Sequence, residues 1–175
     1  AGRLVTDYII ASGGSESTCG DFKIHSFTGP GTFQVTNEGT PSGSTTLDYL
    51  VVAGGGAGAQ NFSAGGGAGG YRESSGTASG SYSISPLGSG VAGVTAGFQT
   101  YPIVVGAGGT GAPVCAPTSG SPTTALGITS TGGGRAGGNA NPQPIFFLGA
   151  TGGSGGGSRC ANAGGAGNTP PVSPP

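Results

Sequence analysis

The most chemically suggestive stretch is residues 47–60, which reads LDYLVVAGGGAGAQ. A strand-like apolar run leads into Gly54, Gly56 and Ala59, and this G-x-G-x-x-A spacing is typical of the turn that opens a dinucleotide-binding fold. That fold needs an α-helix after the glycines, because the helix N-terminus holds the pyrophosphate. The next residues, QNFSAGGGAGGYRESSG, contain interior glycines that each cost about 1 kcal/mol of helix stability relative to alanine. We therefore expect these glycines to have a use other than nucleotide binding.

Residues that could carry acid–base or nucleophilic catalysis are few and widely spaced. The single histidine, His25, lies in an alternating apolar–polar run, which predicts a histidine on the surface of a strand. The six carboxylates show no motif spacing, and the sequence has neither a G-x-S-x-G elbow nor a Gly-Lys-Ser/Thr phosphate loop. We expect the protein not to be an enzyme and to bind no cofactor.

The three cysteines give no metal-site signal. No C-x-x-C pair occurs, and His25 is not near a cysteine in the sequence, so we expect no bound metal. Cys115 and Cys160 both lie in the glycine-rich part of the chain and could form a disulfide, which would leave Cys19 free. The alternative is that all three are small buried thiols.

The composition excludes several classes of partner. Of 175 residues only eleven are charged, five of them Lys or Arg, and the basic residues form no cluster, so we expect no nucleic-acid partner. No apolar run approaches the about 20 residues that a membrane helix needs, so we expect no membrane span. The chain begins at Ala1 and contains no Met, which favours a processed protein or a segment of a longer one.

Residues 1–53 are predicted to form a small antiparallel β module. The runs DFKIHSF (21–27) and TFQVT (32–36) alternate apolar and polar residues around a Gly/Pro turn, and this pattern predicts a hairpin. Residues 8–11 and 47–52 are two further strand candidates.

Residues 54–175 hold most of the 43 glycines and show no helical periodicity. Glycine tracts alternate there with short β-like pieces (82–85, 101–105 and 126–131) and with polar or Pro-rich loops. Such tracts offer no side chains to bury, so their backbone N–H and C=O groups must find partners. A left-handed helix of polyproline-II type has about three residues per turn and directs these groups outward, and neighbouring helices can bond laterally where glycine allows close approach.

We therefore predict that residues 54–175 form a glycine-rich polyglycine-II/β module, a stack with exposed loops. The whole chain is expected to be mostly β plus polyglycine-II and irregular structure, with essentially no α-helix.

The order of the motifs carries a family resemblance. The motifs are DFKIHSFTGPGTFQVTNEG, LDYLVVAGGGAG, GGGAGGYRES, YPIVVGAGGTG, SPTTALGITSTGGGRAGG and GATGGSGGGS. In this order they resemble the glycine-rich domain of bacteriophage tail-fibre and related virion proteins, and more loosely the polyglycine sandwich of T-even-type fibre-tip adhesins. The resemblance implies a rigid polyglycine core whose variable loops bind the host surface. It also implies a place in the virion, other virion proteins and a host-surface glycan or outer-membrane protein as partners, and a homotrimer.

Loop aromatics are the candidates for receptor contact, because amphipathic aromatic side chains dominate recognition energetics. They are Phe62, Tyr71 with Arg72, and the pair Phe146 and Phe147. The two adjacent phenylalanines could instead pin the stack to a neighbour, and the arginines could bond carbonyls at the ends of the tracts.

Two alternative functions stay open at this point. One is a capsid decoration or other virion component without receptor binding. The other is an extracellular glycine-rich filament or an ice-binding protein.

Overall fold

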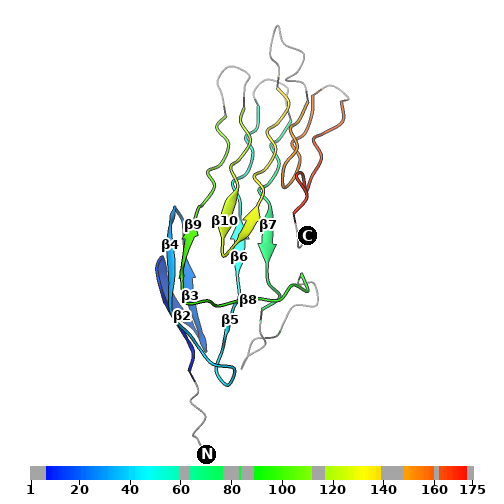
Figure 1. Cartoon of the computed structure of the whole chain (residues 1–175). Helices are drawn as coiled ribbons and strands as arrows, with labels where there is room; N and C mark the ends of the chain where they lie inside the picture. The colour runs from blue at the N-terminus through cyan, green and yellow to red at the C-terminus, as the bar shows by residue number, and fades with distance from the viewer. Residues whose placement is uncertain are drawn as a thin grey trace, which may run out of the picture. The chain divides into compact units, whose positions relative to one another are not determined.

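The computed structural model describes residues 7–59, 64–76, 83, 89–111, 117–138, 148–159 and 162–172. Over these ranges the secondary structure consists of eleven short β-strands and no helix (Figure 1). The strands are β1 (Ile9–Ser12), β2 (Ser15–Cys19), β3 (Phe22–Ser26), β4 (Gly31–Glu38), β5 (Thr46–Leu47), β6 (Leu50–Val52), β7 (Tyr71–Glu73), β8 (Val94–Thr95), β9 (Thr100–Ile103), β10 (Thr123–Ala125) and β11 (Ile128–Ser130). The expectation of a β-rich, helix-free fold is confirmed for this part of the chain.

The strands form one three-stranded sheet, in the order β1-β4-β9, and four two-stranded ones. The pairs are β2 with β3, β5 with β8, β6 with β7, and β10 with β11. The three-stranded sheet is antiparallel throughout, with β4 in the centre.

The described residues fall into two compact units. The first contains those of Ala1–Leu50, Glu73–Ile103 and Ala125–Gly127, and the second contains those of Val51–Arg72, Val104–Thr124 and Ile128–Pro175. The sequence prediction used a single break after residue 53, whereas the chain enters the first unit three times. The reason is strand pairing, because β4 and β5 find their partners β9 and β8 far along the sequence.

The first unit is built around the buried face of β4. Alternation along this strand buries Phe33 and Val35 and exposes their neighbours. Ala11 of β1 and Ile103 of β9 are also buried, so the core of the sheet comes from all three strands. This is the pattern of an antiparallel sheet with one packed face and one solvated face.

The predicted hairpin between residues 21–27 and 32–36 is wrong in its pairing, although both segments form strands. β3 pairs with β2, from Ser15↔Ser26 to Cys19↔Phe22, and β4 pairs with β1 and β9. The β2–β3 loop has only two residues, and its first residue, Gly20, has a φ of 57°, which suits a tight hairpin. β2 was missed because its sequence, SESTC, is polar and shows no alternation.

His25 of β3 is packed against the sheet, which corrects the prediction of a surface histidine. Its side chain is 11% exposed, and its Nδ1 lies 2.8 Å from the carbonyl oxygen of Gly13. Its ring meets the ring of Phe33 edge-on, with the two centroids 5.1 Å apart. The histidine therefore ties the β1–β2 corner to the core of the first unit.

The face of the β2–β3 pair that carries His25 also carries an ion pair between Lys23 Nζ and Glu16 Oε2, 2.7 Å apart. The hydrogen bond from Lys23 lowers the pKa of the Glu16 carboxyl below its ordinary value. Both side chains are exposed to solvent, so this ion pair contributes little to stability.

The hairpin of β10 and β11 has a two-residue turn, Leu126–Gly127, within the β-like piece predicted for residues 126–131. Leu126 has a φ of 53° and Gly127 a φ of 77°, which is the left-handed pair that a type I′ turn requires. Only Ser83 of the predicted piece at 82–85 lies in the described residues, while the piece at 101–105 overlaps β9.

Replacing Leu126 with asparagine is expected to stabilise the protein. A leucine at positive φ carries a steric cost of about 1–2 kcal/mol, which asparagine largely avoids. Urea unfolding followed by circular dichroism should show a higher midpoint for L126N. The control is G127A, which places a Cβ at a φ of 77° and should lower the midpoint. An L126N midpoint at or below that of the wild type would contradict this account of the turn.

Candidate functional site: laterally bonded glycine threads

The acidic, histidine and cysteine side chains do not assemble into a metal site in the part of the chain that the structure describes. Within the described ranges no group of three or more His, Cys, Asp or Glu side chains could hold a metal ion. Cys19 is exposed and has a free thiol, whereas Cys115 and Cys160, the proposed disulfide pair, lie outside the described residues. No helix in the described part of the chain is long and apolar enough to cross a bilayer.

The structure describes two of the five predicted contact residues, and their side chains lie on opposite faces of one strand. Tyr71 and Arg72 are neighbours on β7, where alternation sends consecutive side chains to opposite faces. Tyr71 is 58% exposed and accessible, whereas Arg72 is only 5% exposed. The burial of Arg72 removes its side chain from contact with a surface partner. Phe62, Phe146 and Phe147 lie outside the described residues.

The arginines of the second unit differ in their bonding. Arg135 Nη1 lies 3.4 Å from the carbonyl oxygens of Ala136 and Leu148, as expected of an arginine that bonds tract carbonyls. The Nη1 and Nη2 atoms of Arg72 are buried without a hydrogen-bond partner in the described structure. A guanidinium stays protonated, so its burial in this form is costly.

The glycine tracts of the second unit run as extended threads, drawn as coloured tubes beside one another in Figure 1. We number seven of them in chain order. They are thread 1 (53–58), thread 2 (65–70), thread 3 (104–110), thread 4 (118–124), thread 5 (131–137), thread 6 (153–157) and thread 7 (165–168).

Thread 1 shows how the threads are joined. Gly54 and Ala57, three positions apart, bond to the same two neighbours, donating from their N–H groups to thread 4 and accepting at their carbonyls from thread 5. The bonds are Gly54 N to Ser121 O (3.1 Å), Ala57 N to Thr118 O (3.0 Å), Gly133 N to Gly54 O (2.9 Å) and Ala136 N to Ala57 O (2.9 Å). Ala53 and Gly56, also three apart, donate instead to thread 2. The bonding direction therefore repeats every three residues.

Hydrogen bonds between other pairs of threads also recur every three residues. Threads 2 and 5 are joined by Gly67 N to Gly134 O (2.8 Å) and Gly70 N to Thr131 O (2.7 Å). Threads 5 and 6 are joined by Gly134 N to Ser154 O (2.9 Å) and Gly137 N to Gly157 O (2.8 Å). Threads 6 and 7 are joined by Gly165 N to Gly156 O (2.8 Å) and Asn168 N to Gly153 O (2.8 Å). Backbone-to-backbone hydrogen bonds thus make most of the joins between these segments.

Close approach between threads explains why particular positions are glycine. A Cβ on Gly67 would meet the carbonyl oxygen of Ser154, and a Cβ on Gly134 would meet that of Ala150, both nearer than real Cβ atoms come. A Cβ on Gly65 would meet nothing within 4 Å, and one on Gly55 would have its nearest neighbour at 3.7 Å. Glycine is therefore sterically required at contact positions and dispensable at others.

Two buried hydroxyls complete the bonding where strands continue into threads. Ser130 Oγ is fully buried and donates to the carbonyl oxygen of Val51 (2.9 Å). Thr123 Oγ1 accepts from the N–H of Gly106 (2.9 Å). Each hydroxyl hydrogen-bonds a backbone group of a neighbouring segment.

Comparisons of the chain with protein-family models, with curated proteins and with solved structures give no match.

An alanine substitution at a contact position should destabilise the second unit far more than one at an open position of the same thread. G67A forces a methyl group into thread 6, and overpacking of this kind costs about 1–3 kcal/mol. G65A meets open space and restricts the unfolded chain, so its free energy of unfolding should be unchanged or higher. Urea unfolding of both variants checks this, and equal midpoints would disprove close thread packing.

Proposed function

We propose that the threads are polyglycine-II helices packed side by side into a stiff bundle. A polyglycine-II helix repeats every three residues or so, whereas a β-strand repeats every two. The step of three residues in the bonds between threads supports this assignment. So does the steric need for glycine at positions such as Gly67 and Gly134.

We propose further that the chain is a structural protein of a bacteriophage virion, a tail-fibre or adhesin segment that displays loops for host-surface recognition. The observation that carries this proposal is the lateral bonding of the threads, mainly by backbone groups. A scaffold that depends on its backbone leaves the segments between threads free to vary in sequence. A stiff scaffold also reduces the ordering cost of binding.

The proposed display segments are three of the stretches of sequence that lie between threads. Residues 59–64 separate threads 1 and 2, residues 111–117 separate threads 3 and 4, and residues 139–147 lie between threads 5 and 6. Phe62 falls in the first of these, and Phe146 and Phe147 fall in the third. The partners in this proposal are other virion proteins and a host-surface glycan or outer-membrane protein, and the role is non-catalytic.

Replacing residues 139–147 (NANPQPIFF) with a Gly/Ser segment of equal length tests the adhesive role. The fluorescently labelled full chain is expected to stain one or more strains in a panel of Gram-negative and Gram-positive bacteria, as measured by flow cytometry. The variant should lose this staining because it lacks the two phenylalanines, while its melting temperature stays that of the wild type. A control variant with the same treatment at residues 77–80 should keep the staining.

Other outcomes favour the alternative functions. If no strain is stained, the adhesive role fails, and labelling of the chain in virus particles decides whether it is a capsid decoration or another component without receptor duty. Thermal hysteresis of the purified chain would favour ice binding, and its spontaneous assembly into fibres would favour a filament. Light scattering of the purified chain tests the expected homotrimer.

A further inference from the structure

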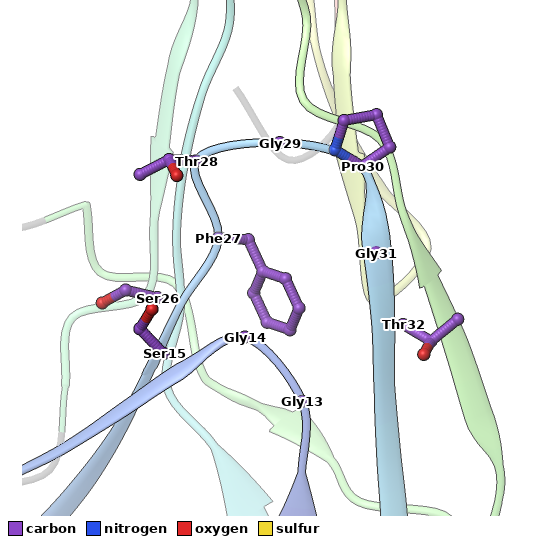
Figure 2. Close-up of a pocket in the computed structure, with 10 residues that line it drawn as sticks. All are labelled: Gly13, Gly14, Ser15, Ser26, Phe27, Thr28, Gly29, Pro30, Gly31 and Thr32. Carbon is purple, nitrogen blue, oxygen red and sulfur yellow. The ribbon is translucent and has the colours of Figure 1, made fainter.

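A hollow of about 350 Å³ lies in the first unit, beside the turn that precedes β4 (Figure 2). It is lined by the β1–β2 corner, by the end of the β2–β3 pair and by the segment that leads into β4, with the residues Gly13, Gly14, Ser15, Ser26, Phe27, Thr28, Gly29, Pro30, Gly31 and Thr32. Its volume falls at the lower end of the about 300–1,000 Å³ that is usual for ligand sites.

The ring of Phe27 is the main apolar surface of the hollow. Figure 2 shows it extending between the Gly13–Gly14 corner and the start of β4. Two glycines make room for it. A Cβ on Gly14 would lie 3.0 Å from the ring Cζ, and a Cβ on Gly31 would lie 3.2 Å from Cδ1. The residue as a whole is half-buried.

The corner that faces the ring is held in place by the strands around it. Gly13 and Gly14 have φ values of 115° and 66°, a left-handed conformation that glycine adopts without steric cost. His25 Nδ1 donates to the carbonyl oxygen of Gly13, and Ser15 pairs with Ser26 in the β2–β3 ladder. The hollow is therefore formed before any ligand arrives, which lowers the cost of binding.

The chemistry of the lining is specific. Hydroxyl side chains are the polar groups, on Ser15, Ser26, Thr28 and Thr32, and no charged side chain contributes. None of these four hydroxyls hydrogen-bonds to the described part of the chain, so each can donate to and accept from a ligand. The absence of a charged lining residue disfavours phosphates and carboxylates, and the hydroxyl lining disfavours a purely apolar ligand.

We propose that this hollow binds one pyranose ring of a neutral saccharide. The C–H face of the sugar stacks on Phe27, since the negative face of an aromatic ring attracts polarised C–H groups, and the sugar hydroxyls bond to the serine and threonine side chains. The proposal deepens the proposed function by placing a glycan contact outside the display segments, and it rests on that function only for the biological source of the sugar. Several copies in one particle would strengthen a weak single contact.

Chemical-shift mapping of the ¹⁵N-labelled full chain tests the proposal. The probes are methyl α-D-mannopyranoside, methyl β-D-galactopyranoside and methyl N-acetyl-β-D-glucosaminide, each titrated alone. At least one probe should shift the amides of residues 13–32, and the shifts should not depend on NaCl concentration. F27L keeps the apolar bulk but loses the aromatic face, and it should weaken binding by up to about tenfold. F27Y should bind like the wild type.

The matched control is F98L, because Phe98 is also an aromatic residue of the first unit but is 72% exposed and lies outside the hollow. It should leave binding unchanged. Equal weakening by F27L and F98L, or no shifts in residues 13–32 with any of the three probes, overturns the proposal. If F27L leaves the staining of bacterial cells intact while no probe shifts these amides, the saccharide site fails but the adhesive function stands. If the wild type neither stains cells nor responds to a probe, the saccharide site and the adhesive function both fail.

Discussion

Hydrogen bonding between neighbouring backbones is the interaction on which the second unit depends. Glycine loses more conformational freedom on folding than any other residue and offers no side chain to bury, so a glycine thread in isolation has no reason to fold. The buried apolar residues of its first thread are Ala53 and Ala57, which bury very little surface. Stability must come from amide groups that find partners in several threads at once, and this makes the unit cooperative.

The first unit is stabilised by different interactions. Its centre is an ordinary antiparallel sheet in which alternation buries Phe33 and Val35, and His25 packs edge-on against Phe33. Hydrophobic burial and aromatic contact stabilise this part, while the buried apolar side chains of the second unit, within the described residues, are the small ones of Val51, Ala53, Ala57 and Ala136. Within one chain of 175 residues, the first unit thus relies on a core of larger side chains and the second mainly on bonds between backbones.

The spacing of the bonds also explains the selectivity for glycine along a thread. With a repeat of about three residues, each backbone position faces a fixed neighbour, so only some positions meet another backbone. Gly67 and Gly134 meet one, and Gly55 and Gly65 do not. The proposed display segment at residues 139–147, by contrast, contains no glycine. A protein that must vary its surface while keeping its framework benefits from that separation, which is why we favour a display function.

The sequence by itself determined the absence of helix in the described residues, the strand at residues 32–36 and the need for glycine tracts to bond laterally, because these follow from local periodicity and from the lack of side chains. It could not determine that β3 pairs with β2, that β9 completes the sheet of β4, or that His25 and Arg72 turn inward. Those outcomes depend on contacts between residues far apart in the chain. The tertiary structure alone decided them, because the energy of a strand pair depends on both strands and cannot be read from the sequence of either one.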